Sequence, residues 1–335
     1  MGLTETYVYI CLRTPPPDPK PRWFILRRRE TLDASVLMPI PSLPSQPPEA
    51  SSVVVLGWFI YVIGGSFKEK TRTSDVWLLD CRTHTWSHVP YSMGVARANA
   101  AARVVDGKIY VIGGCDVFNP NTWGEVFDPK TQTWSFLPPL PLPLMKGGNK
   151  NIHDSVVMDQ KIYVVDGNHR TYFYSPSKGY WGRGNRGQVS RSRRDWCMIE
   201  LINRIYFLTN DGTIFFCEQD ELYWPGREGI MMDTKEVKGL GSLNETLFRS
   251  RVVHFGQLLL DRWERVMYNF GGTIHELEDI YPGARLINFG GNIGLFWDVI
   301  KGDHLEIWGN IEWSNAVMTV DNFLDRYKSN IRQDC

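Results

Sequence analysis

The residues of this chain that could perform chemistry form few recognisable patterns. The clearest is the run Gly182-Arg183-Gly184-Asn185-Arg186-Gly187, which has the GxGxxG spacing of a loop that cradles dinucleotide phosphates. That function needs a strand before the loop, a helix after it and an acidic residue about 20 positions later. Here the run follows Trp181 and the next acidic residue is Asp195, so the sequence favours a flexible loop between repeats over a nucleotide site.

The same loop continues as QVSRSRRD and carries a cluster of arginines, of which Arg191, Arg193 and Arg194 are candidate contacts for a partner. Guanidinium groups pair bidentately with carboxylates and phosphates, so the cluster could receive an acidic or phosphorylated protein. A solvated loop with no partner is the alternative interpretation.

Neither the histidines nor the cysteines form a recognised metal or redox motif. The seven histidines include no HExxH, and the nearest two cysteines, Cys197 and Cys217, lie 20 residues apart. His153 and Asp154 precede a predicted strand where they could face the mouth of a channel, although the sequence favours a structural hydrogen-bonding role over catalysis. No GxSxG nucleophile motif occurs. We therefore predict no catalytic residue, no metal and no cofactor.

The charge and hydrophobicity of the chain limit the classes of partner that it is expected to bind. The 335 residues carry a formal net charge of zero, so neither nucleic acid nor an anionic membrane is predicted as a partner. The longest apolar run, Val53 to Ile63, is too short to span a bilayer, and the N-terminus lacks a signal-peptide pattern. The sequence predicts an intracellular protein, cytoplasmic or nuclear, with reduced cysteines.

A repeat with a period of almost 50 residues positions these side chains. Tyrosine-containing strands end in glycine, a second strand follows, and a tryptophan comes six residues after that strand, at spacings of 48, 47 and 43 residues. Such self-similarity indicates one supersecondary unit stacked several times. The signature residues are Gly64, Gly65, Trp86, Gly113, Gly114, Trp134, Gly167, Trp181, Gly212 and Trp224.

Each unit contains four strand-like runs, which is typical of a propeller blade. The sequence predicts an all-β propeller of five or six four-stranded blades over residues 51–320. Repeats are expected at about 51–90, 98–137, 155–181, 196–224 and 284–320, with an irregular stretch at 225–282 and a tail at 321–335. Arg97 and Asn99 precede the first strand of the second repeat and are further candidates for partner contact, while the tryptophans are expected to pack between blades.

Residues 1–50 hold two strand-like runs, TYVYICL and RWFIL, separated and followed by proline-rich segments. Unpaired strands leave exposed edges, so residues 5–30 are expected to add strands to the last blade.

The glycine pair in KIYVIGG, the spacing of Asp80 to Trp86 and Asp128 to Trp134, and the closing EIWGNIEWSNAVMTV resemble the kelch repeat, and specifically plant F-box/kelch-repeat proteins. The resemblance covers most of residues 5–224 and about 284–320. It implies a propeller that presents a target for ubiquitination, attached to an F-box that docks on a Skp-type adaptor. No F-box is recognisable in this sequence, so adaptor binding is expected only if an F-box is supplied.

Three functions remain open from the sequence. The first is a protein-interaction module like the substrate-recognition propeller of an F-box/kelch ubiquitin ligase. The second is a stand-alone kelch scaffold that binds a partner without ligase function. The third, a remote alternative, is an enzyme similar to galactose oxidase, for whose copper ligands and cysteine–tyrosine crosslink no local motif is found.

Overall fold

The computed structural model describes the strands and most of their connections. The described residues are 8–13, 21–29, 34–41, 51–67, 71–141, 144, 152–166, 170–185, 193–199, 204–209, 212–225, 230–238, 240–249, 285–289, 292–301, 304–310 and 314–320.

Strands dominate the described residues, and each sheet is built from strands that are consecutive in the sequence. The first sheet has three antiparallel strands: β1 (Val8–Arg13), β2 (Pro21–Arg29) and β3 (Ala34–Pro39). Two four-stranded sheets follow: β4 (Ser52–Leu56), β5 (Phe59–Ile63), β6 (Val76–Asp80) and β7 (Thr85–His88), then β8 (Ala101–Val105), β9 (Lys108–Ile112), β10 (Gly124–Asp128) and β11 (Thr133–Phe136).

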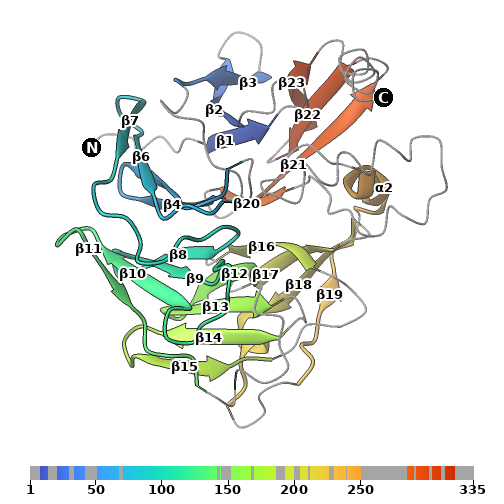
Figure 1. The fold of residues 1–335 in the computed structure, drawn as a ribbon. Helices are drawn as coiled ribbons and strands as arrows, with labels where there is room; N and C mark the ends of the chain where they lie inside the picture. The colour runs from blue at the N-terminus through green and yellow to red at the C-terminus, as the bar shows by residue number, and fades with distance from the viewer. Residues whose placement is uncertain are drawn as a thin grey trace, which may run out of the picture.

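Three more four-stranded sheets complete the described part of the fold (Figure 1). They comprise β12 (Ile152–Met158), β13 (Lys161–Asp166), β14 (Thr171–Ser175) and β15 (Tyr180–Arg183); β16 (Arg193–Ile199), β17 (Arg204–Thr209), β18 (Ile214–Glu218) and β19 (Lys235–Glu236); and β20 (Arg285–Phe289), β21 (Asn292–Lys301), β22 (His304–Asn310) and β23 (Ser314–Val320).

The hairpins follow from local turn chemistry. Asp106 and Gly107 both have positive φ, 48° and 70°, as a two-residue type I′ turn between β8 and β9 requires. Gly64 lies after β5 with φ 60°, and a side chain there would meet the backbone oxygen of Arg97. The paired glycines of the repeat therefore permit a close approach between two backbone segments.

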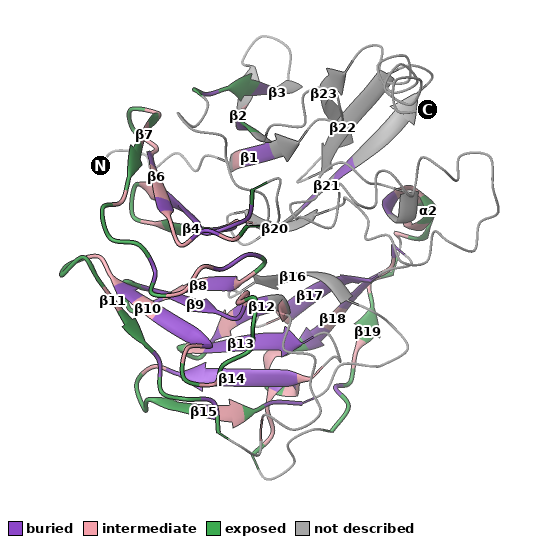
Figure 2. Ribbon diagram, viewed as in Figure 1, coloured by how far each residue is buried: buried purple, intermediate pink, exposed green. Residues whose placement is uncertain are grey.

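Buried side chains join each sheet to the next, as Figure 2 shows by colour. Val54, Tyr61 and Ile63 pack against Ala102, Ile109 and Val111 of the following sheet. Similar clusters join β8–β11 to β12–β15, that sheet to β16–β19, and that one to β20–β23. Cys11, Trp23 and Ile25 of the first sheet pack on Ile60, Val62 and Leu79. Since β3 also lies beside β23, the six sheets follow one another around a ring.

The predicted all-β propeller of four-stranded blades is thus confirmed, with five four-stranded sheets and one three-stranded sheet among the described residues. The N-terminal strands form a sheet of their own next to β20–β23, in place of adding strands to it.

Tryptophan side chains fix the outer edge of three neighbouring blades. The indole Nε1 of Trp86, Trp134 and Trp181 donates to the carbonyls of Pro41, Tyr91 and Pro138, at 2.8, 3.0 and 2.7 Å. Each acceptor lies just after the fourth strand of the preceding blade. The tryptophans therefore bridge adjacent blades as well as packing between them.

The fourth repeat departs from this pattern. Trp224 was expected to begin a fourth strand, but it follows a 3-10 helix, Gln219–Leu222, and lies outside any strand. The fourth strand is β19, a two-residue strand that begins 11 positions later at Lys235. Residues 241–249 of the stretch expected to be irregular form a helix, α2 (Gly241–Arg249), which packs near β21. The shorter spacing of 43 residues was the sequence signal that this repeat differs.

Candidate functional site

The connections between second and third strands are long in the first two four-stranded sheets and lie at the same end of them. They span residues 64–75 and 113–123. Both carry exposed apolar side chains: Phe67 in the first, Val117 and Phe118 in the second, with Val117 77% exposed. We call Phe67, Arg72, Asp116, Val117 and Phe118 the loop surface. Exposed apolar side chains on neighbouring loops are typical of a protein contact site.

The second loop of this surface is held in one conformation by its own residues. The Thr122 backbone N–H donates to the Asn119 carbonyl at 3.1 Å, and the Asn121 N–H donates to the Asn119 side chain at 2.9 Å. The ring of Phe118 meets buried Trp123 edge-on, with centroids 6.1 Å apart. Val117 is therefore presented on an ordered loop, which lowers the entropic cost of binding a partner there.

Arg97 holds this loop from below and is only 1% exposed. Its guanidinium donates to the carbonyls of Gly113, Thr122 and Trp123 at 2.7, 2.6 and 3.0 Å. It also pairs with Glu125, Nη2 to Oε1, at 2.8 Å. Every one of these acceptors lies in the loop or at the start of β10. Arg97 thus fixes both ends of the loop to the connection that precedes β8.

Arg72 joins the two loops. Its Nη1 donates to the Gly114 carbonyl, and its Nη2 lies 3.4 Å from Oδ1 of the exposed Asp116. Cys115 lies between these contacts, within 2.9 Å of Arg97 Nη1. Burial raises the pKa of the Cys115 thiol, which outweighs the nearby positive charge of Arg97. The thiol is consequently protonated at neutral pH and is a packing group rather than a nucleophile.

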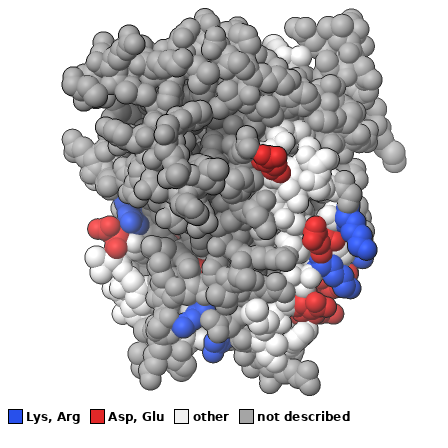
Figure 3. Space-filling model, turned by 90° about the vertical axis from the view of Figure 1, so that its right-hand side faces the viewer, with Lys and Arg blue, Asp and Glu red and all other residues white. Residues whose placement is uncertain are grey.

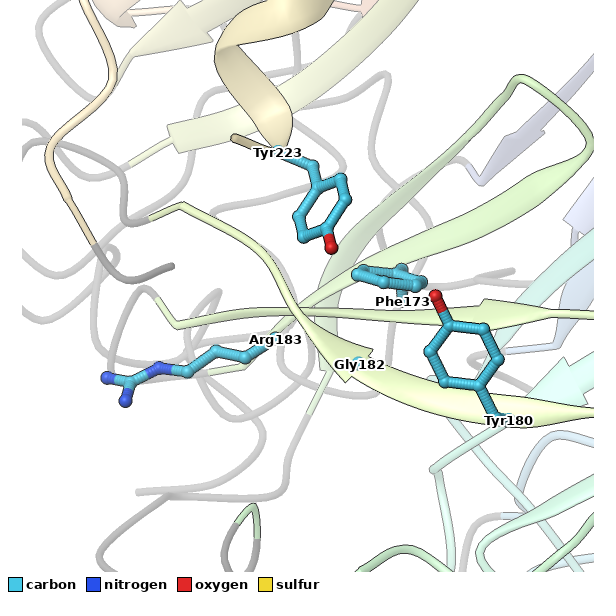
Figure 4. A pocket seen from close by; sticks show the side chains of 5 residues that line it. All are labelled: Phe173, Tyr180, Gly182, Arg183 and Tyr223. Carbon is cyan, nitrogen blue, oxygen red and sulfur yellow. The ribbon is translucent and has the colours of Figure 1, made fainter. Parts of the chain in front are cut away.

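A shallow aromatic pocket lies elsewhere, between β14, β15 and the segment after the 3-10 helix. Its cavity volume is about 430 Å³, and it is lined by Phe173, Tyr180, Gly182, Arg183 and Tyr223. Figure 4 shows the Tyr180 and Tyr223 hydroxyls approaching the Phe173 ring while Arg183 points away. The Phe173 ring contacts Tyr223 at 4.9 Å and Tyr180 at 5.7 Å between centroids.

A cation already covers one side of these rings. Lys161 Nζ lies 5.6 Å from the Phe173 centroid and 5.4 Å from the Tyr223 centroid. Buried Tyr163 packs on the other side of Phe173, and burial, aided by the charge of Asp159, raises the pKa of its hydroxyl. These rings already contact one another and Lys161, so we interpret the pocket as part of the packing between two blades. None of the residues that line it is placed for acid–base chemistry.

Charge on the described surface is mixed. On the face drawn in Figure 3, the described residues include both basic (Lys, Arg) and acidic (Asp, Glu) side chains. This distribution agrees with the zero net charge of the whole chain.

The residues predicted from the sequence to contact a partner lie in different environments in the structure. The prediction that Arg97 contacts a partner is wrong: its guanidinium is buried, pairs with Glu125 inside the protein and cannot reach a partner. Asn99 is exposed and has a φ of 54°, so it turns the chain before β8. His153 and Asp154 lie in β12, and Arg193 and Arg194 begin β16; the side chains of these four are outside the described set. Arg191 and Gly167 lie outside the described residues.

The glycine-rich run is also corrected in part. Gly182 and Arg183 end β15, and Gly184 and Asn185 are buried, their backbone N–H groups donating to Thr171 and Leu222 at 2.9 Å each. This half of the run is ordered strand and connection rather than a flexible loop. The run itself ends at residues 186 and 187, which are not described, and the next described element is strand β16.

The loop surface was only partly visible in the sequence. The long second-to-third strand connections of the first two repeats can be read from the distance between tyrosine and tryptophan. The sequence does not show that Phe67, Val117 and Phe118 are exposed, because an apolar residue in a loop is as often buried beneath the loop. It also does not show that Arg72 links the two loops.

Within the described residues, no group of three or more His, Cys, Asp or Glu side chains is arranged to hold a metal ion. No described helix is long and apolar enough to cross a membrane. Cys11, Cys81, Cys115 and Cys217 take part in no disulfide in the described part of the chain.

Comparison with known proteins places the chain. Residues 23–318 match the family model described as FKB95, Kelch-repeats domain. A putative F-box/kelch-repeat protein of Arabidopsis thaliana is 42% identical over 273 residues, covering 75% of this chain and 67% of the relative. An F-box/kelch-repeat protein of the same plant is 31% identical over 362 residues, covering 96% and 79%. The solved structure of YjhT aligns with a TM-score of 0.48 and 11% identity over 85% of this chain and 90% of that one.

Proposed function

The chain belongs to the F-box/kelch-repeat family, and from that premise we propose that it recognises a target protein through the loop surface. Its propeller is a protein-interaction module. The specific role proposed here is that of the substrate-recognition part of a ubiquitin ligase. The observation that supports this most directly is the presence of exposed Phe67, Val117 and Phe118 on two loops that Arg72 and Arg97 hold in place.

The chemistry of the loop surface limits what it can accept. Its apolar centre favours a partner that offers apolar side chains. The Arg72–Asp116 pair beside it could instead form hydrogen bonds with polar groups at the rim of the partner's contact surface. Aromatic side chains are common anchors in such contacts. A preordered apolar surface with a mixed-charge rim fits a folded protein or a short peptide better than a small metabolite.

Substitutions in the loop surface, compared with one at the opposite end of a blade, test this function. Val117→Asp and Phe118→Ser should abolish capture of the target, because they place polar groups at the centre of the contact. Trp58→Ser is the matched control, since the exposure of Trp58, 60%, lies between those of Phe118 and Val117, and Trp58 lies in the β4–β5 turn at the opposite end of its blade. Target proteins would be measured by quantitative mass spectrometry after affinity capture. Loss with Trp58→Ser but not with Val117→Asp would place recognition at the other end.

The ligase role and the stand-alone scaffold role differ in one measurable property. The described residues among the first 39 form strands β1–β3 and include no helical segment on which an adaptor could dock. We therefore propose that a Skp-type adaptor binds only when an F-box is fused before Met1. If the fusion binds adaptor and promotes ubiquitination of captured targets, the ligase role is supported. If the fusion binds adaptor and targets but no target is ever modified, the scaffold role is favoured.

A further inference from the structure

The outer edge of β11 carries backbone groups that no other described residue satisfies. β11 is the last strand of its sheet (Figure 1), and the Leu137 N–H after it donates to the Gly124 carbonyl at 2.9 Å. In an antiparallel ladder, this bond means that Trp134 and Phe136 face β10 in pairs without mutual hydrogen bonds. The N–H and C=O groups of Trp134 and Phe136 therefore point away from β10, and no described residue bonds to them.

Exposed aromatic side chains accompany this edge. Phe136 is 49% exposed, and Tyr91, in the connection from β7 to β8, is 50% exposed. The Phe136 ring lies against that connection, since a Cβ on Gly94 would come 2.7 Å from its Cζ. Trp134 lies two residues before Phe136, on the same face of β11, and its indole bonds to the Tyr91 carbonyl. The edge thus combines unpaired backbone groups with an aromatic face.

The equivalent strands of the neighbouring blades carry a different side chain at the position of Phe136. That position holds His88 in β7 and Arg183 in β15. His88 already contacts Asp75, at 3.7 Å, and Arg183 is charged at neutral pH. β11 reads Thr-Trp-Ser-Phe and has no ionisable side chain. Since charges on an edge strand discourage pairing with another chain, β11 is the least protected of these three edges.

We propose that β11 pairs in antiparallel orientation with β11 of a second copy of this chain, about a two-fold axis beside Ser135. This proposal goes beyond target recognition and does not depend on it. Two identical antiparallel strands are self-complementary, so Trp134 of each copy lies opposite Phe136 of the other. Each of these residues then exchanges both of its outward hydrogen bonds with its partner.

The side chains of the edge favour a second copy as the occupant. Trp134 and Phe136 share one face, so the paired strands bring each exposed Phe136 ring beside an indole, and such cross-strand aromatic pairs are stabilising. No charge opposes the contact. Four-residue strands bury less than the about 1,200 Å² of a small stable interface, so the association should be weak and depend on concentration.

Charge at Ser135 tests the two-fold arrangement. Ser135 is exposed, and in the proposed pair it lies directly opposite its own copy. Ser135→Lys and Ser135→Glu should each raise the dissociation constant of the dimer about fivefold, because like charges then face each other across the strands. An equimolar mixture of the two variants should regain the dimer, since the facing charges become opposite. Sedimentation velocity of the full chain over the micromolar range measures each sample.

Ser87→Lys is the matched control. Ser87 is also exposed and holds the equivalent position of β7, so this variant should dimerise like the wild type. A wild-type chain that stays monomeric would overturn the proposal, as would a dimer that Ser135→Lys leaves intact or a mixture that does not reassociate. If the wild type is monomeric and Ser135→Lys abolishes target capture, the proposal is overturned in favour of a strand from another protein.

Disulfide trapping supplies a second measurement. Cα atoms across the proposed Ser135 pair would lie about 4.5 Å apart, within the range of a disulfide. Mild oxidation of Ser135→Cys should therefore link two copies through residue 135, as mass spectrometry of the linked peptides would show. Ser87→Cys should remain unlinked, and a link through residue 87 in equal yield would indicate random collision and overturn the proposal.

Two further readouts keep folding and target recognition separate from pairing. The urea midpoint of Ser135→Lys, measured at a concentration where the wild type is monomeric, should equal that of the wild type, because Ser135 is exposed. Val117→Asp should abolish target capture and leave the dimer unchanged, since Val117 lies in the loop surface rather than on β11. Failure of the proposed function and failure of strand pairing are therefore distinguishable.

Discussion

Arg97 and Glu125 form an ion pair in the interior, with Nη2 and Oε1 2.8 Å apart and both side chains 1% exposed. Arg97 lies in the connection between β7 and β8, Glu125 lies in β10 of the blade that follows, and backbone groups complete the pair. Glu125 accepts hydrogen bonds from the Gly94 and Val95 N–H groups at 2.7 and 3.1 Å. Such a pair contributes little by its charge alone, because desolvation offsets the attraction, but breaking it leaves an unpaired buried charge.

Replacing Arg97 with Met should therefore lower the free energy of unfolding by about 3–5 kcal/mol, the usual cost of leaving a partner charge buried and unpaired. Glu125→Gln should cost less, since the amide can keep one hydrogen bond. Arg82→Met is the control: Arg82 pairs with Asp80 at the surface, where solvent screening should make the loss much smaller. Urea denaturation of the three variants measures the difference, and equal losses for Arg97→Met and Arg82→Met would contradict this account.

The same pair shows what the sequence could and could not reveal. The repeat in glycine and tryptophan was enough to predict blades, because these residues report the local turn and the packing between neighbours. The role of Arg97 was predicted wrongly, as a partner contact. Its burial depends on acceptors up to 28 residues away in the next blade, and no local pattern encodes that contact.

From the sequence we could predict that some regions depart from the repeat, but not which structure they form. Trp224 follows the expected spacing yet lies outside a strand, since the Gln219–Leu222 helix occupies the place of the turn. That the N-terminal strands form a three-stranded sheet of their own could not be predicted, for a different reason. Strand runs can be recognised locally, but the edge with which each one pairs depends on the closure of the whole ring.

Two tryptophans of the repeat should differ in their contribution to stability. Trp181 is 5% exposed within a cluster that includes Trp123 and Tyr174, so Trp181→Ala should cost about 3–5 kcal/mol. Trp134 is half-buried, packed on Phe127 with centroids 5.1 Å apart, and its replacement by alanine should cost less, about 2 kcal/mol. Chemical denaturation tests the order. Trp134→Phe isolates the indole hydrogen bond to Tyr91, worth about 1 kcal/mol.

Gly182 should tolerate no side chain. A Cβ atom there would lie 2.2 Å from Cζ of Phe173, whose ring already contacts those of Tyr163 and Tyr223. Gly182→Ala should destabilise the protein by about 1–3 kcal/mol, the range for overpacking a filled core. Gly241→Ala, at the start of α2 with open space around it, should be neutral or slightly stabilising. A thermal-unfolding midpoint that falls equally for both would show that backbone conformation, not the clash, governs the loss.

The aspartate of the repeat should make stability sensitive to acid. Asp80 accepts two hydrogen bonds from the Arg82 guanidinium, at 3.0 and 2.6 Å, and one from the Arg82 backbone N–H at 2.9 Å. The Arg82 side-chain bonds lead in lowering its pKa, from 3.8 to about 2. The pKa of Asp128 is lowered in the same way, mainly by its bond to Lys108.

Because the folded state holds these pKa values below their unfolded values, the carboxylates stabilise the fold fully above about pH 4. That contribution is lost as the pH falls from about 4 toward 2. Asp80→Asn with Asp128→Asn should therefore flatten the dependence of the urea midpoint on pH in this window and leave only a small offset at pH 7. The turns should persist, since the His84 and Gln132 N–H groups bond to the main-chain carbonyls of residues 80 and 128 rather than to the carboxylates. An unchanged acid profile in the double variant would assign the acid sensitivity to other carboxylates.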